Sequence, residues 1–155
     1  MTTLLQHRPG APGLQLGLGP GLRPLGALHQ LQALFDGHSH WAQQRSPQQL
    51  RAMLRGSQAA VSAWDGVRLV GFGRASSDGV FRAVLWDVVV AGPQQGRGLG
   101  RRIVAELLQC PQVRHVERVY LMTTNSAGFY RRLGFENSHR QHLLIWHPDK
   151  AHPPA

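Results

Sequence analysis

The sequence predicts a mixed α/β (α+β) fold, and three observations support this prediction. Residues 59–90 contain short apolar segments separated by turn residues, which is typical of an antiparallel meander. A Gly-rich turn then leads into an amphipathic helical segment that starts near Gly98. An apolar segment at residues 119–123 follows this helix, so we expect a strand parallel to the 80–90 strand across a right-handed crossover.

The 155 residues are expected to form one domain with a single buried core. Residues 9–26 hold six Gly and four Pro, which disfavour regular structure, so residues 1–24 are expected to form a flexible Gly/Pro-rich leader. The folded domain is expected to span residues 25–148, and residues 149–155 are expected to form a tail.

Two helices are expected at the start of the domain. Apolar residues recur at three- and four-residue spacing over residues 28–35, which predicts an amphipathic helix that ends near Gly37. A second helix is predicted over residues 46–54, because Ser46 can cap its N-terminus and Pro47 suits its first position.

The rest of the domain is predicted to alternate strands with helices. Strands at residues 59–64 and 67–72 flank Asp65-Gly66, a pair favoured in type I′ hairpin turns. The later elements are a strand at residues 80–90, a helix from about residue 98 to residue 110, a strand at 119–123, a short helix at 126–133 and a final strand at 142–146.

Composition limits the classes of function and partner. The net charge of +9 comes almost wholly from Arg, but the arginines are scattered, so nucleic-acid binding is not favoured. The single cysteine, Cys110, excludes an internal disulfide and suits a reducing compartment, so a cytoplasmic location is expected. A membrane partner is not expected, because no apolar run reaches the ~20 residues that span a bilayer.

The turn after the 80–90 strand is the strongest functional signal. Its alternating glycines permit positive φ angles and close approach of a ligand to the backbone. They precede a helix N-terminus, whose unpaired N–H groups attract phosphate. Neither the P-loop nor the Rossmann spacing fits these glycines. The sequence therefore predicts a pyrophosphate site formed by Gln95, Gly96, Arg97, Gly98, Leu99, Gly100 and Arg101.

Within this turn, Gln95-x-x-Gly98-x-Gly100 resembles the acetyl-CoA signature Q/R-x-x-G-x-G/A of the GCN5-related N-acetyltransferases (GNAT). The resemblance covers roughly residues 28–146 and includes the segment at residues 125–135. It implies a GNAT-like mixed sheet with an antiparallel N-terminal half, a parallel pair of strands splayed around the acetyl-CoA site, and helices on both faces.

Three shorter segments, at residues 61–66, 86–89 and 116–124, are similar to the cyanobacterial and plastid branch of this family. That branch includes serotonin (arylalkylamine) N-acetyltransferases and protein-lysine acetyltransferases. The resemblance implies acetyl-CoA as co-substrate and a primary amine as acceptor, with a small serotonin-like arylalkylamine favoured. No metal is expected, because the histidine pairs at residues 38–40 and 139–142 have no third ligand in the pattern. A protein lysine or N-terminal amine is the alternative acceptor. A non-catalytic basic module that binds acyl-CoA or nucleic acid is the alternative of another class, and a homodimer through the last strand is also open.

Two side chains are candidates for proton transfer. Asp87 is chosen by elimination among the eight acidic residues, because it interrupts an apolar strand, where partial burial would raise its pKa toward that of a general base. The alternative is that Asp87 fixes a bulge or pairs with an arginine. Tyr130 is chosen as the acid, because the resemblance places it where the family's tyrosine meets the CoA sulfur. Asn125 is expected to cap the short helix or to bind the CoA arm.

Two further groups could contact the substrates. The strand residues before the turn are expected to bind the pantetheine amides as an added strand would, namely Val88, Val89 and Val90. Trp41, Trp64 and Trp86 could stack on an aromatic amine, although core packing is the more common role of a tryptophan.

Overall fold

A computed structural model describes residues 1–15 and 26–154 of the chain. It divides into two compact units, Met1–Met122 and the part of the chain from Thr123 onwards. The first unit is a five-stranded sheet in the order β1-β2-β3-β4-β5. Its strands are β1 (Thr2–Gln6), β2 (Ala59–Asp65), β3 (Arg68–Ser77), β4 (Arg82–Val90) and β5 (Arg118–Leu121).

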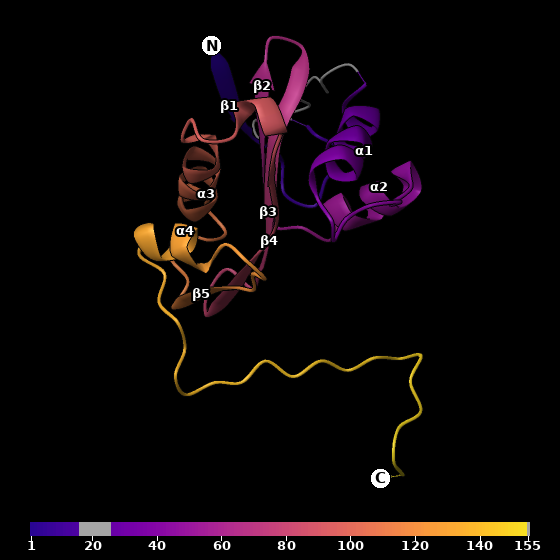
Figure 1. Ribbon diagram of the computed structural model, residues 1–155, viewed down its shortest axis with the longest axis vertical. Coiled ribbons are helices and arrows are strands. Elements are labelled where there is room, and N and C mark those ends of the chain that lie inside the picture. Colours follow the sequence, from indigo (N-terminus) through magenta and orange to yellow (C-terminus); the bar gives the residue numbers. More distant parts are fainter. Residues whose placement is uncertain (16–25, 155) are drawn as a thin grey trace. The chain divides into compact units, whose positions relative to one another are not determined.

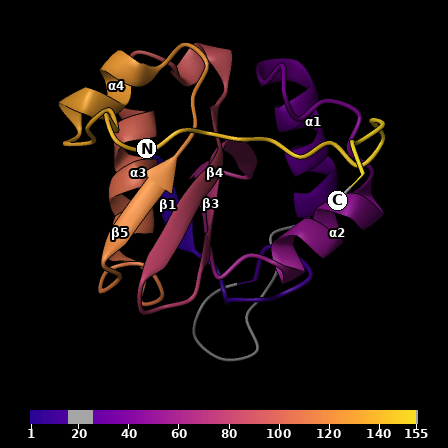
Figure 2. The same ribbon diagram turned by 90° about the horizontal axis from the view of Figure 1, so that it is seen from below.

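The sheet is antiparallel from β1 to β4 and parallel between β4 and β5. The predicted antiparallel meander, β2 to β4, and the predicted parallel pair, β4 and β5, are confirmed, whereas β1 was not predicted. The helices α1 (Ala27–His38) and α2 (Pro47–Arg55) lie on one face, and α3 (Leu99–Gln109) lies on the other (Figures 1 and 2). The mixed α/β prediction is therefore confirmed, with helices on both faces of the sheet.

Local sequence signals explain the helix boundaries of the first unit. Ser46 Oγ accepts a hydrogen bond from the Gln49 N–H at 3.1 Å, and Gln49 Oε1 accepts one from the Ser46 N–H at 2.9 Å. This reciprocal pair forms a capping box, and Pro47 occupies the first helical position behind it. The predicted start of α2 is confirmed.

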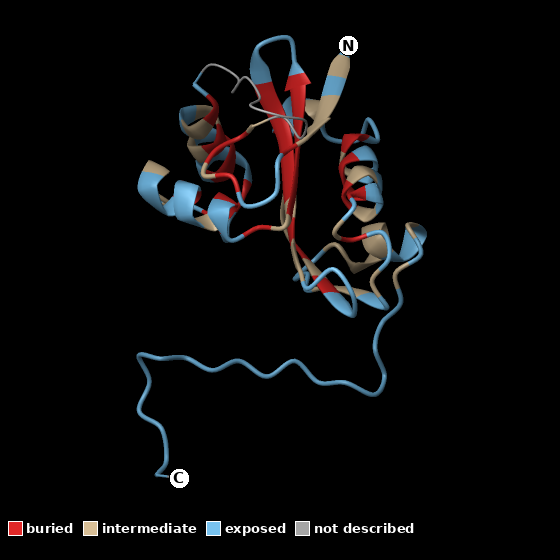
Figure 3. Cartoon of the chain, turned by 180° about the vertical axis from the view of Figure 1, so that it is seen from behind, coloured by how far each residue is buried: buried red, intermediate tan, exposed pale blue. Residues whose placement is uncertain are grey.

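The core lies where the central strands meet α1 and α3, and buried residues concentrate there (Figure 3). Phe35 of α1 packs edge-to-face on Phe72 of β3, with ring centroids 5.7 Å apart. On the other face, a Cβ added at Gly73 of β3 would stand 2.9 Å from Leu107 Cδ1 and 3.0 Å from Ile103 Cγ2. Glycine at this position therefore lets α3 approach the sheet closely.

The expectation of a flexible leader over residues 1–24 is wrong at its start. Thr2–Gln6 form the edge strand β1, which pairs antiparallel with β2. The Gly and Pro residues begin only at Pro9, so they do not interrupt this strand. The chain after β1 is also anchored, because the buried His7 ring contacts the Gln15 carbonyl at 2.8 Å. Residues 16–24 of the expected leader lie outside the described residues.

The hairpin turn differs from the prediction by one residue. Asp65 pairs with Arg68 in the β2–β3 register, so the two-residue loop is Gly66-Val67. Gly66 has a φ of 61°, whereas Val67 does not have a positive φ. A type I′ turn needs positive φ at both central residues, so the predicted type I′ turn at Asp65-Gly66 is wrong.

The second unit contains one short helix, α4 (Ala127–Arg132), followed by Gly134 with a φ of 102°. The final strand predicted at residues 142–146 is not formed. Within the described part of this unit there is no strand for it to pair with, and residues 143–146 are 63–88% exposed. An apolar segment needs a neighbouring strand to satisfy its backbone before it becomes part of a sheet.

Candidate active site

The predicted pyrophosphate turn joins β4 to α3 through a short 3₁₀ segment, η1 (Gly92–Gln94). Gly96 and Gly98 have φ angles of 77° and 79°, a region that L-residues with a Cβ rarely adopt. Gly100 lies within the first turn of α3. Two of the three alternating glycines thus have the left-handed backbone that the spacing predicts.

Most main-chain N–H groups of this turn have no hydrogen-bond acceptors within the described residues. Among the described residues, the N–H groups of residues 96–101 donate to no carbonyl or side chain, and the first bond of α3 runs from the Arg102 N–H to the Gly98 carbonyl at 3.1 Å. Six consecutive free donors at a helix N-terminus form a suitable site for an anion. Arg97 and Arg101 are exposed on the same turn and add positive charge.

The strand that leads into this turn has an open edge. The pairing of β4 with β5 ends at Leu85↔Leu121, so within the described residues β4 has no strand beside it from Trp86 to Val90 on that side. The Ala91 N–H donates to the Val70 carbonyl on the β3 side at 2.9 Å. Because successive residues of a strand alternate, Val88 and Val90 direct their N–H and carbonyl groups toward the open edge.

The three predicted valines are therefore not equivalent. Val89 is buried and pairs with Phe72 on β3, whereas Val88 and Val90 face the open edge. The carbonyl of Val90 accepts a hydrogen bond from Gln95 Nε2 at 3.0 Å. Gln95 thus fastens the turn to the end of β4, which accounts for a glutamine at the first position of the signature.

Asp87 occupies a bulge at the start of this open edge. Its φ is 55°, and the register between β3 and β4 shifts between Phe72 and Arg74. A left-handed backbone is uncommon outside Gly, although Asp tolerates it better than most residues. The bulge turns β4 at the point where its pairing with β5 has ended.

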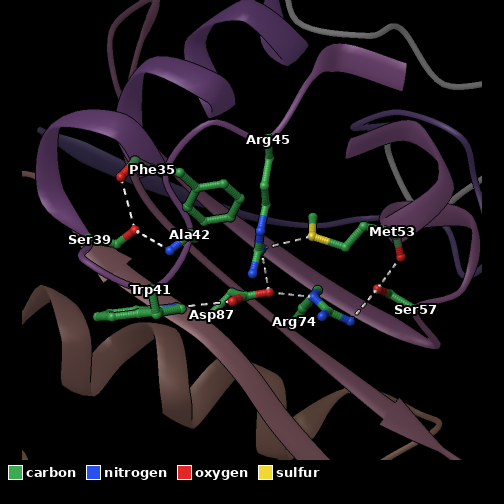
Figure 4. Close-up of polar contacts among 9 residues, drawn as sticks. All are labelled: Phe35, Ser39, Trp41, Ala42, Arg45, Met53, Ser57, Arg74 and Asp87. Carbon is green, nitrogen blue, oxygen red and sulfur yellow. Dashed lines mark hydrogen bonds and ion pairs between the residues drawn. The ribbon is translucent and has the colours of Figure 1, made fainter. Parts of the chain in front are cut away.

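The Asp87 carboxylate is held by three donors (Figure 4). Arg74 Nε lies 2.8 Å from Oδ2, Arg45 Nη1 lies 3.1 Å from Oδ2, and Trp41 Nε1 donates to Oδ1 at 3.0 Å. The Asp87 side chain is only 5% exposed. The cluster of Trp41, Arg45, Arg74 and Asp87, called the Asp87 cluster below, joins β4 to β3 and to the loop between α1 and α2.

The prediction that burial raises the pKa of Asp87 is wrong. Burial does disfavour the ionised carboxylate, but the hydrogen bonds and charges of Arg45 and Arg74 outweigh this effect and lower the pKa of Asp87 below its ordinary value. The structure therefore favours the alternative, in which Asp87 fixes a bulge and pairs with arginines. The error arose because neither arginine is close to Asp87 in the sequence.

A second contact joins the same loop to the pyrophosphate turn. The Gly92 N–H donates to His38 Nδ1 at 3.0 Å. The end of α1 and the loop after it are thus attached to both ends of the open segment of β4. His38 is bonded to Gly92, just after the segment, and Trp41 is bonded to Asp87, just before it. His38 was not predicted as a contact of the site, and Trp41 was predicted only as a possible stacking partner of an aromatic amine; the bonds of His38 to Gly92 and of Trp41 to Asp87 have no signal in the nearby sequence.

Tyr130 and Asn125 belong to the second unit. Tyr130 packs edge-to-face against Phe129 and Phe135, with ring centroids 4.9 and 5.7 Å away. Burial raises the pKa of Tyr130, so its phenol keeps the proton at neutral pH. Asn125 is exposed and does not cap α4, because that helix has Ser126 as its N-cap and no capping side chain. The capping alternative for Asn125 is therefore wrong.

The three tryptophans that could stack on an aromatic amine differ in burial. Trp64 is buried and donates to Ser62 Oγ at 2.7 Å, and Trp86 is half-buried and donates to Ser76 Oγ at 2.8 Å. Trp41 is 49% exposed. Among the described residues, no group of three or more metal-ligating side chains is gathered, and no helix is long and apolar enough to cross a membrane.

A mixed sheet that opens beside a helix-initiating glycine turn agrees with the class that the sequence resemblance implies, the acyl-CoA-dependent transferases. Residues 27–135 match the model of the acetyltransferase (GNAT) family. The chain belongs to the GNAT family of acetyltransferases.

The chain is similar to plant proteins of this family over part of its length. It is 46% identical over 69 residues to serotonin N-acetyltransferase 2, chloroplastic, of Oryza sativa subsp. japonica, a match covering 44% of this chain and 34% of the relative. It is 36% identical over 84 residues to histone acetyltransferase TAP1 of Glycine max, a match covering 53% of this chain and 36% of that relative. The matched region is thus about a third of each relative's length.

Solved structures confirm the fold. A GNAT family acetyltransferase from Streptococcus pneumoniae TIGR4 superposes with a TM-score of 0.71 at 22% identity, covering 97% of this chain and all of that one. The ribosomal-protein-S18-alanine N-acetyltransferase of Escherichia coli gives a TM-score of 0.65 at 17% identity, and the superposition covers 89% of this chain and 79% of that one. At these identities the likeness concerns the fold alone.

Proposed function

We propose that this GNAT acetyltransferase transfers the acetyl group of acetyl-CoA to a primary amine, and that a small serotonin-like arylalkylamine is its preferred acceptor. The observation that carries the proposal is that the main-chain groups of Val88 and the N–H of Val90 lie on the open edge of β4, which leads directly to the free N–H groups of residues 96–101. This line offers an open strand edge followed directly by an anion site. A pantetheine arm with amides, followed by a diphosphate, has the matching order of groups.

When bound, acetyl-CoA supplies an acetyl thioester. The residues of the chain then have three tasks. The N–H groups of residues 96–101, aided by Arg97 and Arg101, hold the diphosphate. The open edge of β4 orients the pantetheine amides, and a free N–H at Val88 is suited to stabilise a developing oxyanion. On the resemblance to the family alone, Tyr130 is the proposed proton donor to the departing thiolate, and burial raises the pKa of its phenol.

The acceptor must be a neutral amine when it attacks. An alkylammonium with a pKa near 10.4 is only about 0.1% neutral near pH 7.4, which is a handicap of roughly 4 kcal/mol. The Asp87 cluster holds two arginines and one carboxylate and therefore has a net positive charge, so a third cation beside it is disfavoured. The site thereby favours the neutral form of a bound amine. Asp87 has little capacity to take the proton itself, since its pKa is lowered.

The acceptor class rests on similarity to the rice relative named as a serotonin N-acetyltransferase. A protein lysine is the second candidate, because the soybean relative is named as a histone acetyltransferase at lower identity. The two proposals differ in the acceptor, so one panel of acceptors separates them.

A thiol-release assay with acetyl-CoA tests the proposal. Serotonin, tryptamine, hexylamine, a lysine-containing peptide and a peptide with a free N-terminus serve as acceptors. We expect CoA release with the arylalkylamines to exceed release with either peptide. Release with a peptide alone would move the assignment to protein acetylation. CoA binding without release for any acceptor would point to a non-catalytic module.

Tyr130→Phe tests the proposed acid in the same assay. The variant removes only the phenolic hydroxyl group and keeps the ring that packs edge-to-face on Phe129 and Phe135. We expect turnover to fall by about 100-fold, as for loss of a general acid, while the affinity for CoA changes little. Wild-type turnover in this variant would remove Tyr130 from the mechanism.

A further inference from the structure

Trp41 is exposed beside the open segment of β4, and its orientation is fixed. Its indole Nε1 donates to Asp87 Oδ1 at 3.0 Å, and the ring of His40 packs edge-to-face against it at 5.0 Å. The side chain is nevertheless 49% exposed. An indole whose polar edge is already bonded presents its ring, rather than a hydrogen-bond donor, to anything that approaches.

The carboxylate that holds Trp41 is not itself free to bind a substrate. Asp87 Oδ2 already accepts from Arg45 and Arg74, Oδ1 accepts from Trp41, and the side chain is 5% exposed. An ammonium group therefore has no access to an unpaired charge here. Recognition at this position depends on the exposed ring of Trp41.

The backbone of the loop is also held in place. Ser39 Oγ donates to the Phe35 carbonyl at 2.9 Å and accepts from the Ala42 N–H at 3.2 Å, so Trp41 lies within a closed turn (Figure 4). At the other side of this turn, His38 is bonded to Gly92. A loop restrained at both ends can hold an aromatic ring in one position without the aid of a ligand.

We propose that the ring of Trp41 is the platform that binds the aromatic group of the acceptor, which makes it the residue that selects arylalkylamines over aliphatic amines. This inference rests on the proposed function, because it takes Val88 and Val90 as the strand edge that orients the thioester. Asp87 directly precedes that edge. An acceptor whose arene lies on Trp41 is thus held next to the residues that orient the acetyl donor.

The chemistry of the platform is specific to a flat ring. Stacked or edge-to-face aromatic pairs gain free energy beyond the area they bury, and an alkyl chain gains only the burial. Arg45 and Arg74 form part of the Asp87 cluster, and their charge disfavours an ammonium group there while leaving the arene unaffected. The site therefore combines binding of an aromatic group with a preference for the neutral amine.

Steady-state kinetics with tryptamine and hexylamine test this inference in the full chain. We expect Trp41→Leu to lower kcat/KM for tryptamine by about tenfold, mainly through KM, with hexylamine changing by less than about twofold. Trp41→Phe is expected to retain most of the preference, since it keeps an aromatic ring. An equal loss for both amines, or no loss for tryptamine, would overturn the proposal.

Phe81→Leu is the matched control. Phe81 is a 58% exposed aromatic residue in the same unit, and it lies roughly 20 Å from Asp87 along β4 at a strand rise of about 3.3 Å per residue. We expect this variant to retain the kinetics of the wild type with both amines. A matching loss of tryptamine preference in Phe81→Leu would contradict a specific role for Trp41.

A binding measurement keeps this inference separate from the proposed function. If the wild type transfers acetyl to no amine, calorimetry with tryptamine in the presence of CoA decides the matter. Binding that weakens about tenfold in Trp41→Leu supports the platform even though the transferase proposal has failed. Equal binding in both proteins, or none in the wild type, overturns the platform. Equal CoA affinities verify that each variant is folded.

Discussion

Asp87 shows how one residue can determine the geometry around it. Its backbone turns β4 at a φ of 55°, and its carboxylate accepts from three side chains, two from the loop between α1 and α2 and one from β3. The bulge frees the following strand edge, and the carboxylate fixes the loop that carries Trp41. A residue in this position has a structural effect on both substrate sites without touching either substrate.

Asp87→Asn tests this structural role. Asn tolerates a left-handed backbone, so the variant mainly removes the charge. We expect the free energy of unfolding to fall by about 2–3 kcal/mol at pH 7, because two partly buried arginines lose their counter-charge. The pH profile of turnover is expected to keep its shape, and loss or displacement of the acidic (low-pH) limb would instead identify Asp87 as a base. Urea unfolding and kcat/KM against pH are the measurements.

The pH dependence of the same variant has a defined sign. The pKa of Asp87 is lower in the folded protein than its ordinary value of 3.8, so its stabilisation is fully present above that value. It is lost as the pH falls through the folded pKa, and the difference between wild type and variant should shrink there. Glu117→Gln is the control: in its ion pair with Arg82, the Glu117 side chain is 53% exposed and the Arg82 side chain 44% exposed, so we expect the variant to keep the wild-type free energy of unfolding.

At the scale of elements, the close approach of α3 to the sheet positions the pyrophosphate turn. The N-terminus of α3 follows the turn directly, and its apolar face packs over Gly71 and Gly73 of β3. A Cβ at Gly73 would also come within 3.4 Å of Val88 Cγ2. The same glycine therefore accommodates both the helix and the strand of the proposed thioester site.

Gly73→Ala is expected to destabilise the protein by about 1–3 kcal/mol, because the added methyl group overpacks a site closed by buried Leu107 and Ile103. It should also weaken CoA binding, since α3 or Val88 must shift. Thermal unfolding and calorimetry measure the two effects. Gly37→Ala in α1 provides the control, because a Cβ there meets nothing within 4 Å and the helix gains propensity. A stable Gly73→Ala protein would contradict the close packing.

At the scale of the whole molecule, the sequence predicted the layered fold and the backbone of the glycine turn. Hydrophobic periodicity, the capping residues at Ser46 and Pro47, and the glycine spacing at Gly96 and Gly98 are local signals, and each led to the correct element. Contacts between distant residues were not predictable in this way. The partners of Asp87 lie 13, 42 and 46 residues away, so the direction of its pKa was predicted wrongly.

The missed strand β1 and the strand wrongly predicted at residues 142–146 have a related cause. The strand β1 was missed because the Gly and Pro content of residues 9–26 was taken to disfavour regular structure in the residues before Pro9 as well. Its formation also depends on pairing with β2, a strand some 60 residues later in the sequence. The segment at residues 142–146 has the composition of a strand, but composition alone supplies no neighbouring strand. Strand formation in both cases is decided by a partner rather than by the segment.

The central claim is that free main-chain N–H groups after β4 hold the diphosphate of acetyl-CoA, and calorimetry on a pair of glycine variants tests it most directly. Gly98 and Gly79 have φ angles of 79° and 78°, and a Cβ at either meets nothing within 4 Å, so valine should strain both turns alike. Gly98→Val is expected to weaken CoA binding by at least about tenfold, with Gly79→Val retaining wild-type affinity. Equal CoA affinity in the two variants would contradict the account.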